Sequence, residues 1–422
     1  MIDIKQIIEN KEKVQQALSK RMKEEDMNLD LIVQTYNEWK LKLTDFEKER
    51  SRQKGFNELM SKSKKGSDEF KQNLAELKNI SEDVKKLENA TSELEQKLTS
   101  LVEVLPNIPD DDVVGGEKEN NKILKTVGKI PTFDFKIKDH LDVASNLGMI
   151  DMERGAKLAG ASFALYTGAG AQLEWALINY FVAQHLADGY KMILPPHLLV
   201  EKSGYTAGQF PKFKEDVYWC QDGNFLLPTS ETAMANLYRD EVIPEEKLPM
   251  KLFSYTPCYR REAGGYRTNE RGLIRMHQFN KVEMFQYTLP QYSPVAFEEL
   301  VQKACRLVEG LGLHYNIVQL AAGDCSSQCA KTVDIEVYLP FLKRYQEVSS
   351  ISNVRDYQAR RGNIKYKPTD GGKTQYVHML NASGLATSRL MVALLETYQN
   401  ADGSLTVPEV LRPLMGIDKI TK

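Results

Sequence analysis

The sequence has 422 residues, which is enough for two or three domains. Hydrophobic residues make up 42% and charged residues 27%, with a formal net charge of −2. This balance excludes a strongly basic nucleic-acid binder, so any contact with nucleic acid has to come from local basic patches. No apolar run approaches the ~18 residues of a membrane span, so we expect no membrane-spanning helix.

The cysteines and the first residues bear on the compartment. Five cysteines are scattered along the chain, an odd number that suits a reducing environment. Cys325 and Cys329 have a CxxxC spacing, but no second pair or nearby histidine completes a zinc site, so we expect two buried thiols. The opening residues MIDIKQIIENKEK include acids and lack the apolar segment of a signal peptide. We therefore expect a cytoplasmic protein.

A highly charged region follows a short helical lead-in. Over residues 70–101, apolar residues recur at steps of three or four, a heptad pattern interrupted once near Ile80. A more diluted apolar stripe covers residues 29–60, and Gly66 and Ser67 between the stripes are typical of a turn and a helix start. The pattern predicts an antiparallel hairpin of two helices, each ~35 residues and ~50 Å long. A dimerising coiled coil is the alternative.

Four lysines gather toward the predicted tip of this hairpin: Lys54, Lys62, Lys64 and Lys65. Lysines on a helix are most often simply solvated, and on this evidence alone these four are candidates for contacts with nucleic-acid phosphates. The second helix ends at the proline-containing stretch VLPNIP, and an acidic, glycine-containing stretch follows it. We therefore predict a helical arm at residues 1–105, a linker at 106–125 and a mixed helix-and-strand domain at 126–422.

The mixed domain contains an amphipathic helix at 172–188 and a short strand at 190–194 that two prolines end. A strand at 225–227 leads into Thr229-Ser230-Glu231, where a hydroxyl can cap a helix and an early glutamate suits its dipole. Further along the chain we expect a helix at 294–310, strands at 315–320, 332–339, 345–350 and 374–380, a turn at 381–384 and a helix at 385–398.

Between these segments lies the most informative stretch, a predicted hairpin. Strands are expected at 253–262 and 273–287, and the charged loop 263–272 that joins them is too long for a tight turn. Side-chain alternation and antiparallel pairing can gather five side chains on one face: Arg260, Glu262, Arg275, Phe279 and Glu283. Such a face suits a ligand with phosphates, an amine or hydroxyl, and a flat base. The alternative is a solvated face of a surface hairpin.

Four segments carry a family resemblance. CYRREAG at 258–264 and RGLIRMHQFNKVE at 271–283 resemble motif 2 of the class II aminoacyl-tRNA synthetases. LNASGLATSRLMVALLE at 380–396 resembles motif 3, and GYKMILPP at 189–196 resembles motif 1, the element that forms the dimer in that class. The resemblance implies an α+β fold, with a catalytic domain built on an antiparallel β-sheet flanked by helices.

Within that class the details are similar to the seryl-tRNA synthetase family. Thr229-Ser230-Glu231 matches its TxE element, EVSS at 347–350 its metal-binding strand, and SNVRDYQARR at 352–361 the segment that follows. The long helical hairpin and VLPNIP match its tRNA-binding arm, so the resemblance covers essentially the whole chain. Prolyl- and threonyl-tRNA synthetases fit less well, because no room remains after motif 3 for their anticodon-binding domain.

The resemblance implies an ATP-dependent enzyme that converts L-serine to seryl-adenylate and transfers the seryl group to tRNA(Ser), with tRNA(Sec) as a further candidate. It implies a homodimer, and Mg²⁺ held by Glu347 and Ser350. Arg260 would bridge the serine carboxylate and the α-phosphate, and Arg389 would hold the γ-phosphate. The implied ATP-binding set is Arg260, Arg261, Glu262, Arg275, Phe279, Glu347, Val348, Ser349, Ser350 and Arg389.

For serine, the resemblance assigns the ammonium group to Thr229 and Glu231 and the carboxylate to Arg260. Glu283 would accept a hydrogen bond from the hydroxyl, with Ser383 nearby. A buried carboxylate that waits for a hydroxyl rejects alanine ~10⁴–10⁵-fold by analogy with other sites, because it would otherwise be left unpaired.

Two other functions are weighed against this one. A paralogue that loads an activated amino acid onto a carrier protein is expected to lack the helical arm. A non-catalytic coiled-coil RNA-binding protein is expected to have lost Arg260 or Arg389, and neither is lost. The motif 2 loop at 265–270 departs from the usual bacterial wording, and Ser388 replaces the commoner glycine of motif 3.

Overall fold

The computed structural model describes residues 1–262 and 272–422. The motif 2 loop, with its unusual wording at 265–270, therefore lies outside the described residues. The chain divides into two compact units, Met1–Pro106 and Asn107–Lys422. Within the described ranges, every helix is too short or too polar to cross a bilayer.

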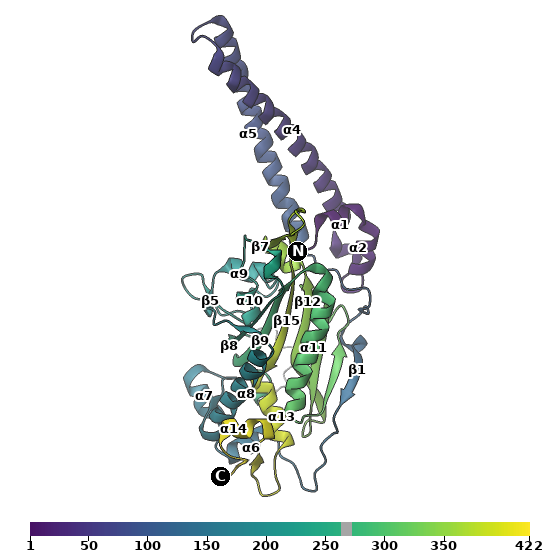
Figure 1. Ribbon diagram of the computed structural model, residues 1–422, viewed down its shortest axis with the longest axis vertical. Helices are drawn as coiled ribbons and strands as arrows, with labels where there is room; N and C mark the ends of the chain where they lie inside the picture. Colours follow the sequence, from purple (N-terminus) through teal and green to yellow (C-terminus); the bar gives the residue numbers. More distant parts are fainter. Residues whose placement is uncertain (263–271) are drawn as a thin grey trace. The chain divides into compact units, whose positions relative to one another are not determined.

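The first unit is helical, and its two long helices run antiparallel beside each other (Figure 1). Ser67 caps the second of them, since its hydroxyl accepts a hydrogen bond from the Phe70 backbone N–H at 3.1 Å. The predicted helical hairpin is confirmed. The helices of this unit are α1 Ile4–Glu9, α2 Lys11–Leu18, α3 Glu24–Met27, α4 Leu29–Lys62 and α5 Asp68–Glu103.

The apolar seam between α4 and α5 is tight near the base of the hairpin and loose toward its tip. Ile80 and Leu98 are buried, whereas Leu74, which the heptad pattern also assigned to the seam, is 51% exposed. In this region Arg52 of α4 forms an ion pair with Glu76 of α5. The seam toward the tip is therefore partly polar.

The second unit is built on a sheet that is antiparallel except for the β4–β8 pair, in the order β1-β10-β11-β12-β15-β9-β8-β4. In that order the strands are Lys122–Val127, Tyr315–Gln319, Lys331–Leu339, Arg344–Arg355, His378–Ala386, Gln278–Thr288, Met250–Tyr259 and Lys191–Met192. Helices flank this sheet, so the predicted α+β architecture is confirmed (Figure 1).

Smaller elements complete the unit. The helices are α6 His140–Asn146, α7 Met152–Ala159, α8 Gly168–Ala187, α9 Glu201–Thr206, α10 Ser230–Met234, α11 Ser293–Gly310, α12 Tyr357–Arg361, α13 Thr387–Thr397 and α14 Arg412–Met415. The short strands are β2 Ile150–Asp151, β3 Leu165–Tyr166, β5 Leu198–Leu199, β6 Phe225–Leu226, β7 Val242–Pro244, β13 Lys365–Lys367, β14 Gln375–Tyr376, β16 Leu405–Thr406 and β17 Lys419–Ile420.

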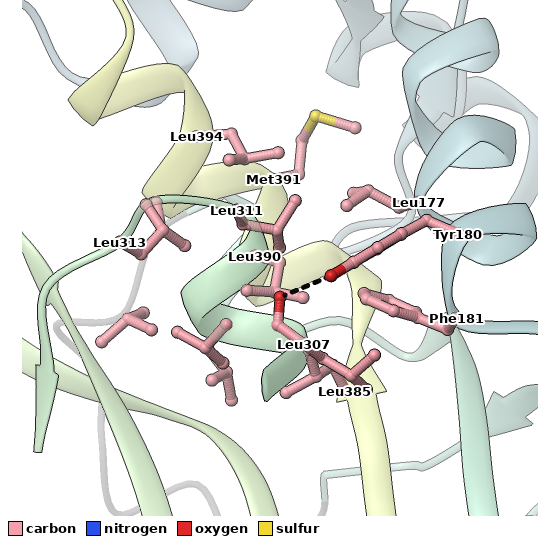
Figure 2. Close-up of a cluster of buried hydrophobic side chains, with 14 of the residues drawn as sticks. Leu177, Tyr180, Phe181, Leu307, Leu311, Leu313, Leu385, Leu390, Met391 and Leu394 are labelled. Atoms are coloured by element: carbon pink, nitrogen blue, oxygen red, sulfur yellow. Dashed lines mark hydrogen bonds between the residues drawn. The ribbon is translucent and has the colours of Figure 1, made fainter. Parts of the chain in front are cut away.

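Helices α8, α11 and α13 meet in the main hydrophobic core. Phe181 of α8 and Leu390 of α13 are fully buried in it (Figure 2). The hydroxyl of Tyr180 reaches across this core and donates a hydrogen bond to the carbonyl of Leu307 on α11 at 3.3 Å. The same helix α13 begins at the edge of the site described below, so this core holds that edge in place.

The stretch predicted as a linker, residues 106–125, packs on the second unit. The side-chain N–H of Asn107 donates to the carbonyls of Gln328 and Val354, both at 2.9 Å. The segment then continues into β1, which pairs with β10. These contacts are long-range, so the acidic composition of the stretch did not reveal them. The three-part division of the chain itself stays a prediction.

The strand limits of the predicted hairpin are wrong. The first strand, β8, ends at Tyr259, and the second, β9, begins only at Gln278. Glu262 has a φ of 53°, outside the extended region, so the chain has left the strand there. Side-chain alternation therefore does not place Arg260, Glu262 or Arg275, although it does hold for Phe279 and Glu283.

The turn predicted at 381–384 is also wrong, because these residues lie inside β15. The strand is central in the sheet, where Ala382 pairs with Ile351 of β12 and Ser383 with Glu283 of β9. Pairing on both sides overrides the local turn preference of the Asn-Ala-Ser-Gly sequence.

Candidate active site

A cavity of about 770 Å³ opens over the faces of β9, β11, β12 and β15. It is lined by nine of the predicted site residues: Thr229, Glu231, Arg260, Glu262, Glu283, Glu347, Ser350, Ser383 and Arg389. A smaller cavity of about 50 Å³ shares several of these residues and adds Arg275, Phe279 and Val348. The structure thus brings together segments that lie far apart in the sequence.

Two residues of the predicted ATP-binding set do not line either cavity. Arg261 is exposed, and its backbone N–H donates to the carbonyl of Asp216 at 2.8 Å. Ser349 is fully buried, and its hydroxyl donates to the carbonyl of Ser383. The hydrogen bonds of both residues therefore go to other parts of the chain, not to the cavity.

One end of the cavity gathers hydroxyl and carboxyl groups around Glu283, which is 2% exposed. Thr229 caps the short helix α10, and this places the first residues of that helix against β9. The hydroxyls of Thr229 and Ser230 and the backbone N–H of Glu231 all donate to the Oε2 atom of Glu283, the latter two at 3.1 and 3.2 Å. These three hydrogen bonds therefore fix the position of the Oε2 atom of Glu283.

Lys281 is a cavity residue that the sequence reasoning missed. It is 5% exposed, and its Nζ atom lies 2.8 Å from Glu283 Oε2 and donates to Thr229 Oγ1 at 2.7 Å. A signal was available, because residues 279, 281 and 283 alternate onto one face of β9. A lysine between Phe279 and Glu283 on the same face of this strand was the feature to examine.

The two buried carboxyl groups of this end differ in pKa. Burial alone would raise the pKa of Glu283, but Lys281 and the hydrogen bonds to it hold that pKa below its ordinary value. Burial, together with the neighbouring Glu283, raises the pKa of Glu231 to about 7. One oxygen of Glu231 accepts a hydrogen bond from Gln358 at 2.7 Å. Glu231 is thus poised to change charge near neutral pH.

The other end of the cavity carries arginines. The guanidinium of Arg260 lies 5.1 Å from the ring centroid of Phe279. Arg389, in the first turn of α13, lies 3.2 Å from the carboxylate of Glu347 and also donates to the carbonyl of that residue at 3.0 Å. Guanidinium groups stay charged and bind two oxygens at once, which suits a phosphate chain.

Arg275 and Glu262 meet at the smaller cavity, with their side chains 2.6 Å apart. The predicted grouping of these two residues is therefore correct, although the predicted reason, a shared strand face, is not. They are brought together where both strands have ended.

Carboxylates on β11 and β12 face the arginine end. Arg389 and Arg260 lower the pKa of Glu347 below its ordinary value, against the opposing effect of burial. Asp334, which the sequence reasoning missed, is 6% exposed and opposite Ser350 in the sheet register. Its Oδ1 atom has no partner among the described residues, and burial raises its pKa well above the ordinary range.

A metal ion here would need ligands from outside the protein. No group of three or more His, Cys, Asp or Glu side chains in the described ranges could hold one unaided. Glu347, which is 41% exposed, and Ser350 both line the cavity and present oxygen atoms. Oxygen ligands completed by phosphates and water are what Mg²⁺ prefers, so these residues fit that ion.

The antiparallel sheet, the arginine pair and the acidic strand beside it define a class II aminoacyl-tRNA synthetase. Residues 218–398 match the family described as tRNA synthetase class II core domain (G, H, P, S and T). Residues 1–109 match the seryl-tRNA synthetase N-terminal domain. The chain belongs to the seryl-tRNA synthetase family.

Individual relatives agree over the full length. The chain is 47% identical to serine–tRNA ligase 2 of Clostridium acetobutylicum, with complete coverage of both chains. It is 43% identical to the serine–tRNA ligase of Fervidobacterium nodosum, covering 100% of this chain and 99% of that protein. It resembles the crystal structure of seryl-tRNA synthetase from Pyrococcus horikoshii complexed with ATP, with a TM-score of 0.92, 32% identity and coverage of 100% and 99%.

Proposed function

We propose that the cavity is where this serine–tRNA ligase joins L-serine to ATP and then passes the seryl group to tRNA(Ser). In the first step a carboxylate oxygen of serine bonds to the α-phosphorus of ATP, and the bond to pyrophosphate breaks. In the second, the 3′-hydroxyl of the tRNA bonds to the seryl carbonyl, loses its proton, and AMP leaves. The supporting observation is that one cavity sets arginines at one end and two buried carboxylates at the other.

The first step needs no strong base, because the attacking carboxylate is already an anion. It needs alignment and neutralised charge. Arg260 would bridge the serine carboxylate and the α-phosphate, Arg389 would hold the γ-phosphate, and Arg275 would assist the phosphate chain. Phe279 would stack on adenine, with Glu262 hydrogen-bonded near the base.

The carboxylate end would bind the amino acid. Glu231 and Thr229 would receive the ammonium group, and Glu283 would accept a hydrogen bond from the hydroxyl, with Ser383 nearby. Glu347 and Ser350 would hold Mg²⁺. When bound, this ion neutralises phosphate charge, while Arg260 and Arg389 orient the reacting groups.

The helical arm would bind the tRNA. The tip lysines (Lys54, Lys62, Lys64 and Lys65) are exposed, and none has an ion-pair partner among the arm residues described. They would contact phosphates of the long extra arm and read its shape. A carrier-protein loader is not favoured, because residues 1–109 match a domain typical of the tRNA-charging family. Whether tRNA(Sec) is also a substrate is part of the test below.

Assembly and location complete the proposal. A homodimer formed through α8 and the residues at and just after β4 is supported by exposed large apolar side chains, since Trp175 on α8 is 54% and Leu194 after β4 is 72% exposed. A cytoplasmic location is supported by free cysteines, of which Cys325 and Cys329 are buried as expected.

The test is ATP–pyrophosphate exchange on the purified protein with serine, alanine, threonine or glycine, and with Glu283→Ala as control. We expect exchange with serine, its loss in the variant and its loss on chelation of Mg²⁺. Charging of tRNA(Ser) and tRNA(Sec) transcripts then tests the second step, and light scattering gives the oligomeric state. A folded protein that shows no serine-dependent exchange would disprove the proposed roles.

A further inference from the structure

Lys281 occupies a place in the amino-acid end of the cavity that no step of the proposed reaction requires. Its ammonium group is buried between Glu283 Oε2, at 2.8 Å, and Thr229 Oγ1, at 2.7 Å. Burying a charged lysine is costly unless it is paired. An uncharged side chain of the same length would fill the same space, so the charge itself needs an explanation.

The hydrogen bonds around Glu283 show what Lys281 leaves available. Its Oε2 atom already accepts from Lys281, Thr229, Ser230 and the backbone of Glu231. Its Oε1 atom accepts no hydrogen bond from any residue the structure describes. A ligand side chain therefore meets a carboxylate with one free oxygen and a charge that is already balanced.

The charges at the amino-acid end of the cavity also favour a ligand with an uncharged side chain. Glu231 and Glu283 are two buried carboxylates, and Lys281 supplies one positive charge beside them. When Glu231 is ionised, one further ammonium, that of the α-amino group, neutralises the set. Without Lys281, neutrality would require a second ammonium on the ligand, and the place for it would be beside Glu283.

We propose that Lys281 is a specificity-determining residue that makes the pocket select a hydroxyl, and reject an ammonium, on the β-carbon of the amino acid. The inference rests on the proposed function, in which Glu283 receives the side chain of the substrate. The relevant competitor is L-2,3-diaminopropionate, which has the size of serine and carries an amino group in place of the hydroxyl. Lys281 rejects it through repulsion between like charges in a buried site.

The experiment measures kcat/KM for pyrophosphate exchange with L-serine and with L-2,3-diaminopropionate in each protein. The ratio of the two values cancels any loss of folded or active enzyme. In Lys281→Met we expect this ratio to fall at least ~100-fold, because like-charge repulsion is removed and Glu283 gains an unbalanced charge. Lys281→Arg keeps the charge and should keep the preference for serine.

Two controls isolate the charge from the packing. Lys281→Met combined with Glu283→Gln restores neutrality. The ratio of kcat/KM for serine to that for diaminopropionate should therefore rise again toward the value of the unaltered enzyme. Lys303 is also buried and ion-paired, to Asp188 at 3.0 Å, but it lies outside the cavity. Lys303→Met should therefore leave the ratio unchanged even if the protein is less stable.

The inference and the proposed function can fail separately. Absence of serine-dependent exchange in the unaltered enzyme would count against the proposed function. An unchanged ratio in Lys281→Met and in Lys281→Gln, with serine exchange intact in the unaltered enzyme, would overturn the role of Lys281 alone. For a variant too weak for kinetics, thermal stabilisation by each amino acid gives the same comparison.

Discussion

The helical arm and the catalytic unit use charged residues in opposite ways. On the arm, charged side chains are exposed, and the pairs they form, such as Lys71 with Asp68, contribute little to stability. In the catalytic unit, Lys281, Glu283 and Glu231 are buried, and the pKa values of both glutamates depend on their charged neighbours in this group. A single charged residue on the arm can therefore be replaced with little effect on the others. In the cavity, replacing one charged residue changes the electrostatic environment of its neighbours.

The strongest test of this contrast is the loss of one cavity arginine. Arg389→Ala should lower kcat/KM for pyrophosphate exchange ~10³-fold, because a preorganised positive charge is lost where phosphate charge is bound. Arg154, an exposed arginine paired with Asp151, is the matched control, and Arg154→Ala should stay within about twofold. Equal losses in the two variants would contradict the contrast.

Acid should destabilise the catalytic unit and spare the arm. Burial lowers the pKa of both His185 and His378 to about 4, and all six histidines lie beyond residue 106. In the unfolded chain these groups titrate near ~6.5, so stability is full above that pH and falls as the pH drops toward 4, by about 3 kcal/mol per histidine.

Chemical denaturation between pH 7.5 and pH 4 measures this loss. His185→Phe should remove the part of this loss in unfolding free energy that comes from His185. The part that comes from His378 should remain. A catalytic unit whose unfolding free energy does not change over this range would refute the prediction.

The arm makes its contribution only in the transfer step. Replacing the four tip lysines by glutamine should raise the KM for tRNA(Ser) ~10- to 100-fold and flatten its salt dependence, because phosphate contacts are lost. Pyrophosphate exchange should not change. Lys85 and Lys97 are exposed on α5 away from the tip, and the same substitution there should have a smaller effect. A similar rise in the KM for tRNA(Ser) in both sets of variants would show that the tip lysines are not the specific contact with the tRNA.

The smallest expected effect is a pH dependence of serine binding. With a pKa of about 7, Glu231 is mostly protonated at pH 6 and mostly ionised at pH 8. The ammonium of serine pairs with the ionised form, so the KM for serine should fall ~10-fold between these values. Glu231→Gln should bind serine weakly and without this dependence, and a dependence that survives in this variant would assign it to another group.

Much of the molecule could be predicted from the sequence by local rules. The heptad spacing identified the α4–α5 hairpin, because contacts along a helix recur every three to four residues. Leu74 was misplaced because the spacing alone does not report how deeply the facing helix buries each position. The motifs named nine of the residues that line the larger cavity, although they did not show how these residues are held.

What only the tertiary structure decided is how those residues are held. Residues 381–384 form a central strand because β9 and β12 pair with it on both sides. Arg275 meets Glu262 beyond the ends of their strands, where alternation no longer applies. The proposed role of Lys281 depends on its contacts with Thr229 and Glu283, and Thr229 lies 52 residues away in the chain. Burial and partner charges are properties of the folded cavity, so local periodicity determined the elements and long-range packing determined the chemistry.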